Sequence, residues 1–130
     1  MAFQYEVIDH VQLAAPIGEE NTARDCYHCL LGFKEMMKPE SLRKRGGVWF
    51  QAGDVHIHIG VESSFVPANK AHPAIRIKGL DAFIDHLKRN SLPFTVDNNL
   101  PGANRLYLAD PFGNRLEFLE WIDHARCEHV

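Results

Sequence analysis

Two histidines stand two residues apart in the stretch DVHIHIGV, which covers residues 54–61. Alternate residues of a β-strand point to opposite faces. Ile57 and Ile59 therefore occupy one face of this predicted strand, and His56 and His58 occupy the other. The aliphatic face is suited to packing beneath a helix, which leaves the imidazoles on the opposite, open face. Imidazoles in that position are suited to metal coordination or to proton transfer near neutral pH.

Three further groups recur at matching places in the two halves of the chain. His58 follows His10 by 48 residues, and Glu117 follows His72 by 45 residues. A carboxylate buried among three imidazoles is costly unless a cation compensates its charge, and a divalent ion would keep the imidazoles neutral and the carboxylate ionised. Nitrogen and carboxylate ligands favour Fe, Mn, Co, Ni or Zn over Ca or Mg. Three or four protein ligands also leave positions open for substrate, as in a catalytic site.

These groups need a scaffold, and the sequence contains two copies of one order of elements, strand–helix–strand–strand–strand. In the first copy we expect strands at 6–14, 33–38, 47–52 and 54–61, with a helix that begins after the N-cap Asn21 and stops at Gly32. In the second copy we expect strands at 72–78, 94–97, 105–109 and 115–121, with a helix at 80–90. The chain is thus predicted to be one α+β domain: module one at 6–62, a connector at 63–71, module two at 72–121 and a tail at 122–130.

Composition excludes several classes of protein. The chain has 130 residues, a net charge of -3 and a pI of about 6.2, which argues against nucleic acid as a partner because phosphate contacts need clustered cations. The one basic cluster, Arg43-Lys44-Arg45, is interpreted as a solvated hairpin turn. No apolar run approaches the ~20 residues that span a bilayer, and no signal peptide pattern opens the chain, so we expect a cytoplasmic protein without a membrane partner. Cys26 and Cys29 are expected to be packing thiols of the first helix.

Four stretches carry a resemblance to a known family, and they are IDHVQLA, CYHCLLGFKE, HPAIRI and YLADPFGNRLEFLEW. With them the sequence resembles the vicinal oxygen chelate superfamily (the glyoxalase, bleomycin-resistance and dioxygenase group) over residues 6–121. The most specific part is Asp-Pro-x-Gly-Asn followed by an inward glutamate. The resemblance implies a cupped eight-stranded mixed sheet around one metal, with helices on its convex face. By matching position it implies His10, His72 and Glu117 as ligands, with His58 at the remaining ligand position.

The resemblance leaves several activities open. Glyoxalase I typically places two histidines and two glutamates around its metal, so His58 replaces a carboxylate here and could itself serve as the base. Extradiol dioxygenases use a two-histidine, one-glutamate Fe(II) triad, which would leave His58 or His56 for acid–base work. Fosfomycin-resistance enzymes carry a tyrosine where Tyr107 stands, but their potassium- and phosphonate-binding loop is not evident in TVDNNLPGAN, which has no lysine. Bleomycin-type binding proteins share the fold and generally lack the metal ligands.

The resulting prediction is a metal-dependent lyase or isomerase of the glyoxalase type that acts on a small molecule with vicinal oxygens. Its divalent metal, Ni, Zn, Mn, Co or Fe, would act as a Lewis acid on those oxygens. The predicted catalytic groups are His58, Glu117 and Tyr107. The predicted substrate pocket contains His56, Gln12, Trp49, Arg105 and Arg115. We also expect a homodimer, with the ligands of one metal coming from one chain or from two.

Overall fold

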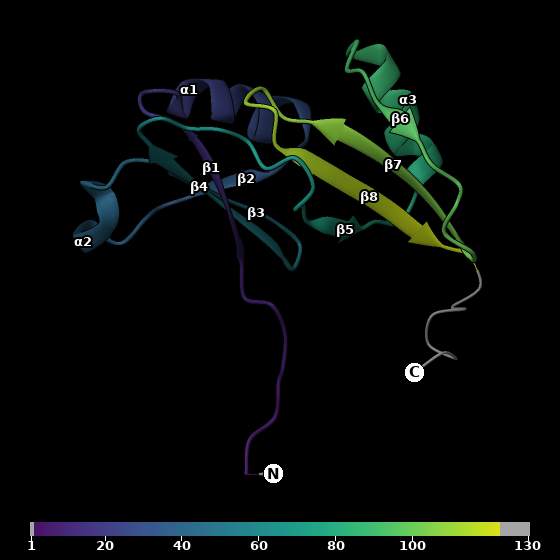
Figure 1. Cartoon of the computed structure of the whole chain (residues 1–130), viewed down its shortest axis with the longest axis horizontal. Helices are drawn as coiled ribbons and strands as arrows, with labels where there is room; N and C mark the ends of the chain where they lie inside the picture. Colours follow the sequence, from purple (N-terminus) through teal and green to yellow (C-terminus); the bar gives the residue numbers. More distant parts are fainter. Residues whose placement is uncertain (1, 123–130) are drawn as a thin grey trace. The chain divides into compact units, whose positions relative to one another are not determined.

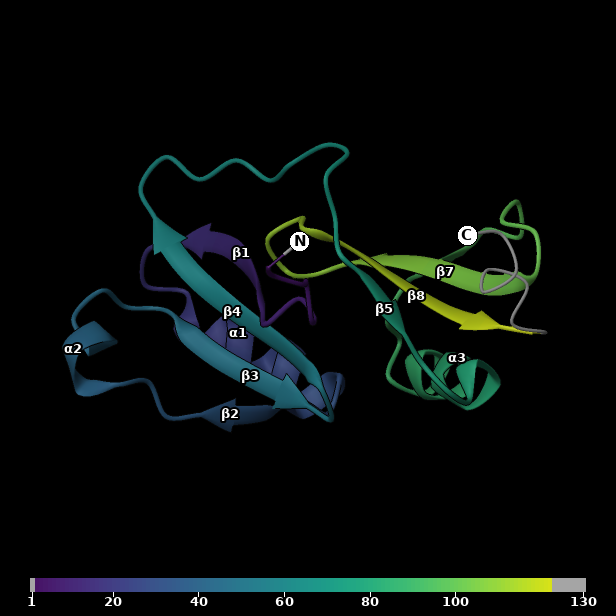
Figure 2. The same ribbon diagram turned by 90° about the horizontal axis from the view of Figure 1, so that it is seen from below.

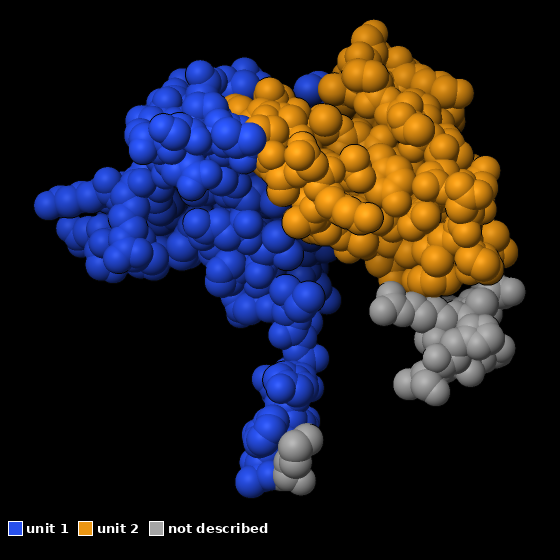
Figure 3. All heavy atoms as spheres, viewed as in Figure 1, with its two compact units in different colours: residues 1–66 blue, residues 67–130 orange. Residues whose placement is uncertain are grey.

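The computed structural model describes residues 2–122. The chain divides into two compact units, residues 1–66 and 67–130, which are coloured separately in Figure 3. Each unit contains one four-stranded mixed sheet, so the eight expected strands and the α+β class are confirmed, with the strands shared equally between two sheets. Within residues 2–122, no helix is both long and apolar enough to cross a membrane.

The first unit has its strands in the order β1-β4-β3-β2. They are β1 (Val11–Pro16), β2 (Lys34–Met36), β3 (Val48–Ala52) and β4 (Val55–Glu62). β1 runs parallel to β4, and the other neighbours are antiparallel. Helix α1 (Glu20–Ala23) continues directly into the π-helical segment η1 (Arg24–Leu30), and the short helix α2 (Glu40–Arg43) lies between β2 and β3. Figures 1 and 2 show α1 and η1 along one face of this sheet.

The face of the first sheet that packs against the helix is apolar, as the alternation in β4 predicts. Ile57 and Ile59 are only 1% and 2% exposed. Tyr27 of η1 stacks on Phe50 of β3, with ring centroids 5.4 Å apart and planes at 24°. Fully burying one large apolar side chain contributes about 1.5–3 kcal/mol. This packing leaves His58 on the other side of β4.

The second unit has its strands in the equivalent order β5-β8-β7-β6. They are β5 (Ala74–Arg76), β6 (Thr95–Val96), β7 (Ala103–Ala109) and β8 (Arg115–Trp121), and helix α3 is Leu80–Arg89. β5 is parallel to β8, while β7 is antiparallel to both β6 and β8. Phe83 of α3 packs on Phe118 of β8, with centroids 4.7 Å apart. The predicted apolar face of α3 is confirmed, because Leu80 and Leu87 are buried.

Several predicted strand starts differ from the structure, and two of these differences concern candidate ligands. The strand expected at 6–14 begins at Val11, and residues 2–10 form neither helix nor strand. The strand expected at 72–78 is limited to Ala74–Arg76. Polar and apolar residues alternate in the sequence before Val11 as well, but β1 pairs with β4 only from Val11 onward. His10 therefore lies before β1, on the N-terminal segment, and His72 lies before β5, on the connection from β4.

The expected helix and turn of the first unit also differ from the structure. The helix begins at Glu20 with Glu19 as its N-cap, its last seven residues have π-type bonds, and Asn21 lies inside it. A repeat of apolar residues at three and four positions does not distinguish α from π hydrogen bonding. The basic cluster begins at Arg43, the last residue of helix α2, so it does not form a simple hairpin turn. Its side chains are exposed, as expected.

The turn between β7 and β8 is built around one buried carboxylate. Asp110 is 5% exposed. Its Oδ1 accepts hydrogen bonds from the backbone N–H groups of Phe112, at 2.9 Å, and Asn114, at 2.8 Å, and its Oδ2 accepts from Asn114 Nδ2 at 2.9 Å. Gly113 has a φ of 88°, which favours glycine. This turn sets the register that places Tyr107 beside Glu117.

We expect Asp110→Ala to destabilise the fold by about 3 kcal/mol, because it removes hydrogen bonds to a charged group and leaves buried N–H donors without a partner. Urea unfolding followed by circular dichroism measures the change. Asp85→Ala, on the exposed side of α3, is the matched control and should change stability by less than about 0.5 kcal/mol. Equal effects of the two substitutions would contradict this role of Asp110.

A second carboxylate caps α3 from a strand far away in the sequence. The Glu120 oxygens accept hydrogen bonds from the backbone N–H groups of Gly79, at 3.0 Å, and Leu80, at 3.1 Å. These bonds satisfy donors that a helix start otherwise leaves unpaired. They lower the pKa of Glu120 below its ordinary value of 4.5. A lowered carboxyl pKa means that the folded state favours the ionised form, so this stabilisation is present above pH 4.5 and is lost as the pH falls through the folded pKa.

We therefore expect Glu120→Ala to lower the free energy of unfolding at pH 7, with a difference from the parent protein that shrinks below about pH 4.5. Denaturant titrations at several pH values measure this difference. Glu62→Ala, which removes an exposed glutamate at the end of β4, should give a difference that changes little with pH. A pH-independent effect of the Glu120 substitution would show that the carboxylate charge is not what stabilises the helix start.

Candidate functional site

Three polar strand residues, Glu117, Tyr107 and Thr95, define the candidate site in the second unit. The ladder sets Ala74, Glu117, Tyr107 and Thr95 side by side across β5, β8, β7 and β6. Their face is opposite to Phe118, which packs beneath α3. Glu117 is nevertheless only 6% exposed. A carboxylate this deeply buried requires partners.

His72 contacts acceptor atoms through both ring nitrogens. Its Nδ1 lies 2.8 Å from the Lys70 carbonyl oxygen, and its Nε2 lies 2.9 Å from Glu117 Oε1. A carbonyl oxygen can only accept, so Nδ1 carries a proton and donates it to Lys70. The carboxylate also only accepts. The Nε2 atom therefore either donates a second N–H to Glu117, or it binds a cation that the Glu117 oxygen also binds.

The donor set of this pair fits a transition metal. Metal bonds of about 2.0–2.2 Å to imidazole and carboxylate allow two atoms 2.9 Å apart to occupy neighbouring positions on one ion. The carbonyl at Nδ1 fixes the tautomer that presents Nε2, as outer partners of ligand histidines commonly do. His72 and Glu117 were both predicted as ligands, and the structure brings them into direct contact.

Arg105 supports Glu117 from the other side. Its Nη1 lies 3.4 Å from Glu117 Oε2, and its Nη2 lies 3.4 Å from Asp97 Oδ2. Its Nε is buried and has no hydrogen-bond partner among the described residues. Arg105 was predicted to line the substrate pocket, whereas its guanidinium is committed to two carboxylates. Asp97 was not predicted; its position across the ladder from Arg105 is set by the β6–β7 pairing, which the sequence does not reveal.

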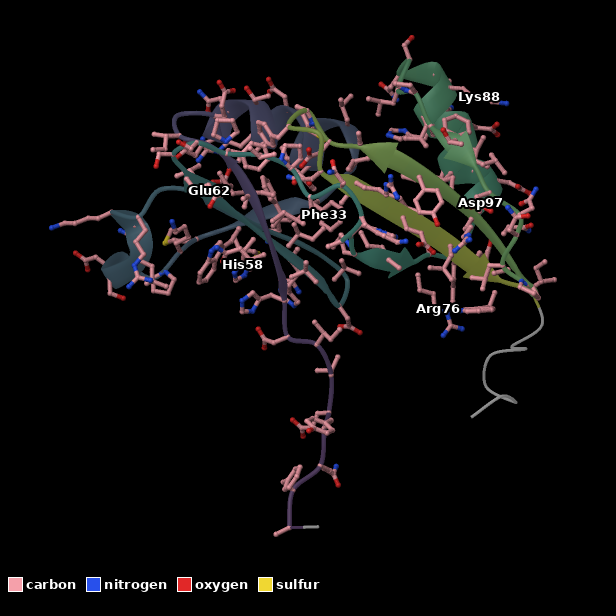
Figure 4. All side chains as sticks on the ribbon, in the orientation of Figure 1. Phe33, His58, Glu62, Arg76, Lys88 and Asp97 are labelled. Atoms are coloured by element: carbon pink, nitrogen blue, oxygen red, sulfur yellow. The ribbon has the colours of Figure 1, made fainter. Side chains whose placement is uncertain are left out.

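In the first unit, three rings form a stack on the open face of the sheet. Trp49 and His58 face each other across the β3–β4 ladder, with ring centroids 4.0 Å apart and planes at 7°. His10 stacks on the other side of His58, at 4.1 Å and 15°. Figure 4 shows His58 on the side of the sheet away from helix α1. Nearly parallel rings direct their nitrogen lone pairs along parallel planes, so in this arrangement His10 and His58 stack and do not chelate.

Burial and charge favour the neutral form of His58. Its pKa is lowered from the ordinary value of 6.5, first by burial and then by the neighbouring His10 and His56. A neutral imidazole is the form that binds metals or accepts a proton. Asp9 accepts a hydrogen bond from His10 Nδ1 at 2.8 Å, and this contact lowers the pKa of Asp9. It also leaves His10 Nε2 as the ring atom available to a ligand.

Of the remaining predicted pocket residues, Gln12 and Trp49 line a pocket in the first unit and Arg115 lines a separate one in the second. A pocket of about 240 Å³ in the first unit includes Gln12 and Trp49, together with the unpredicted Lys38. The Gln12 side chain lies across Gly60, where a Cβ atom would come within 2.5 Å of its Nε2. A larger pocket, about 590 Å³, includes Tyr107 and Arg115 in the second unit. His56 lines neither pocket and lies opposite Gln51 in the ladder.

The four predicted ligands are thus described as two pairs. His10 and His58 lie in the first unit, and His72 and Glu117 lie in the second. Among residues 2–122, no group of three or more His, Cys, Asp or Glu side chains is placed to hold one ion. The sequence predicted that all four groups hold one ion, which stays a prediction; within each unit the structure places the two members of a pair in contact. The sequence did not reveal the Lys70 carbonyl or Arg105 as the groups that orient the second pair.

Comparison with known proteins places this chain in a family. The family model of the Glyoxalase/Bleomycin resistance protein/Dioxygenase superfamily matches residues 7–118. Among curated protein sequences, none matches significantly. A Bacillus anthracis protein assigned to the glyoxalase family is 46% identical, with 93% of this chain and 99% of that chain covered and a TM-score of 0.90.

More distant structures share the fold. A lactoylglutathione lyase from Agrobacterium tumefaciens is 20% identical, with 89% of this chain and 94% of that chain covered and a TM-score of 0.70. An antibiotic binding protein from a Streptomyces species is 17% identical, with 93% and 98% covered and a TM-score of 0.68. One fold thus carries both a lyase and a binding protein, so activity has to be argued from the site. The match over residues 7–118 and the 46% identity show that the chain belongs to the glyoxalase/bleomycin resistance/dioxygenase superfamily.

Proposed function

We propose that this protein is a metal-dependent lyase or isomerase of the glyoxalase type, acting on a small molecule with two neighbouring oxygens. The observation that carries the proposal is the His72–Glu117 contact, in which the Lys70 carbonyl fixes the imidazole and its Nε2 faces a buried carboxylate oxygen. His72 and Glu117 would be two of the metal ligands, and His10 would be a third, from the same chain or from a second copy. His58 would be either the fourth ligand or the base, because an imidazole whose lone pair binds the metal cannot also accept a proton there.

The bound metal would supply Lewis-acid polarisation of the two substrate oxygens. The chain's own groups would handle the proton. His58 is held in its neutral form by its surroundings, so it is suited to remove a proton from a carbon beside a carbonyl and return it to the neighbouring carbon. Tyr107, whose ring meets that of His72 edge-on with centroids 5.5 Å apart, would donate its hydroxyl to a substrate oxygen. Arg105 would orient the Glu117 carboxylate through its contact with Oε2 at 3.4 Å.

We expect His72→Ala and Glu117→Gln each to weaken binding of Ni, Zn, Co, Mn or Fe(II) by more than the roughly 100-fold that loss of an outer-shell partner costs. Metal analysis of protein purified without chelator, followed by calorimetric titration of each ion, measures this loss. His86→Gln on α3 is the matched histidine control and should bind metal like the parent protein.

Turnover distinguishes the activities that the family contains. Oxygen-independent conversion of a hemithioacetal by the metal-loaded protein supports the proposal. Oxygen consumption with Fe(II) and a catechol would assign it instead to the dioxygenases, and thiol transfer to fosfomycin would assign it to the resistance enzymes. Failure to bind any of these metals would overturn the enzymatic proposal and favour a drug-sequestering protein.

We also propose that the protein acts as a homodimer joined through residues 2–10. This segment extends from β1 as a chain without helix or strand (Figure 1). Four large apolar side chains on it are exposed, Phe3 at 61%, Tyr5 at 91%, Val7 at 82% and Ile8 at 75%. β1 lies at the edge of its sheet, so an extension of it offers unpaired backbone groups. A second copy offers the same edge and the same apolar side chains, which suits a self-complementary contact.

We expect light scattering to give a mass of about twice 14.8 kDa for the parent protein. Replacing Phe3, Tyr5, Val7 and Ile8 together by serine should raise the dimer dissociation constant at least tenfold, or about 1.4 kcal/mol. Met37→Ser, at another residue that is 83% exposed, controls for general loss of surface apolarity. A parent protein that is monomeric at all concentrations, or a dimer unaffected by the four substitutions, would contradict this interface.

A further inference from the structure

The two arginines on the open face of the second sheet differ in what they contact. Arg105 is paired with Asp97 and Glu117. Arg115 is exposed, and among residues 2–122 no carboxylate lies within ion-pair distance of it. Both guanidinium groups lie over the ring of Tyr107, that of Arg105 at 5.5 Å and that of Arg115 at 5.7 Å from the centroid, so the two arginines differ in their carboxylate partners. Of these two cations, only Arg115 is therefore available to an external anion.

Arg115 lines the pocket of about 590 Å³ in the second unit. Two hydroxyl-bearing residues, Tyr107 and Thr95, line the same pocket and are neighbours in the β6–β7 ladder. The remaining walls are largely apolar and include Phe94 and Leu108. A guanidinium and two hydroxyl donors within an apolar cavity form a recognition set for a small oxyanion, because arginine presents a planar fork of donors and the hydroxyls supply further donors.

Tyr107 connects this pocket to the proposed metal ligands. It lies opposite Glu117 in the β7–β8 ladder, and its ring contacts His72. A molecule in the pocket would therefore lie next to the His72–Glu117 pair. Glu117 itself carries a negative charge, but it is shielded by Arg105 and His72. Arg115 thus gives this side of the pocket a positive charge that its neighbours do not neutralise.

We propose that the pocket lined by Thr95, Tyr107 and Arg115 binds an oxyanion group of the substrate, so that the substrate is a small oxyacid, either a carboxylate or a phosphorylated compound. The assignment of this oxyanion to the substrate rests on the proposed function, whereas the anion site itself does not require a metal. Arg115 holds the anionic end of the molecule, and Tyr107 lies between that end and the vicinal oxygens that the metal would polarise.

The test is a nuclear magnetic resonance titration of the full chain, isotopically labelled and freed of metal. Inorganic phosphate and acetate are the probes, acetamide is the neutral match for acetate, and sodium chloride keeps the ionic strength constant. We expect saturable shifts at the amides of Thr95, Tyr107 and Arg115 with the anions and none with acetamide. Comparing phosphate with acetate shows which class of oxyacid the pocket prefers.

Arg115→Gln should raise the dissociation constant of the preferred anion at least tenfold, and Arg115→Lys should give an intermediate value because it keeps the charge and loses the planar fork. Arg89→Gln, on the exposed end of α3, is the matched arginine control and should leave the constant unchanged. Binding that survives in Arg115→Gln, or shifts that acetamide also produces, would overturn the anion site.

The same titration separates this inference from the proposed function. Because no metal is present, loss of the anion site would leave the metal-binding results untouched. Failure to bind metal with an intact anion site would instead refute the enzymatic proposal and leave an anion-binding pocket. For an active enzyme, Arg115→Gln should raise KM for an anionic substrate at least tenfold and change the KM of an uncharged analogue less than twofold. An equal rise for both substrates would show that Arg115 does not recognise the charge.

Discussion

The rest of this structure depends on one constraint. Side chains alternate between the two faces of each strand, and a helix packs against one of those faces. In the first unit Tyr27 of η1 packs against Phe50, and in the second unit Phe83 of α3 packs against Phe118. Each contact commits one face of a sheet to the apolar core. Since successive residues of a strand point to opposite sides, the polar residues between the core residues have only the other face to occupy. The candidate site is therefore a consequence of the core.

The two open faces that result differ in electrostatic character. In the first unit the polar groups are imidazole rings, and His58 lies between Trp49 and His10, where burial lowers its pKa. In the second unit a buried carboxylate is the central group, and a histidine and an arginine neutralise it. A repeated scaffold thus carries two chemically different halves, one with stacked imidazoles and the other with a buried carboxylate.

Two carboxylates stabilise the second unit through hydrogen bonds from backbone N–H groups. Glu120 reaches from β8 to the start of α3, and Asp110 closes the turn that joins β7 to β8. Both carboxylates accept hydrogen bonds from backbone N–H groups, and both lie within ten residues of Glu117 in the sequence. They fix the strand that carries the candidate ligand and its neighbour Arg115. Precision at the site therefore depends on hydrogen bonds that take no part in its proposed chemistry.

The sequence by itself determined the repeated order of elements and the apolar and polar faces of β4, because both follow from local periodicity. Matched spacing also predicted His10, His58, His72 and Glu117 as one set of ligands, and within each unit the structure places two of them in contact. The sequence could not show where the strands begin, since Val11 and Ala74 start their strands only where a partner strand supplies hydrogen bonds. The distinction between Arg105 and Arg115 also came only from the tertiary structure. Both arginines follow the same alternation, and only the ladder places Asp97 and Glu117 beside one of them. Strand period is a local property, whereas the charges that meet across a sheet depend on register between segments distant in the chain.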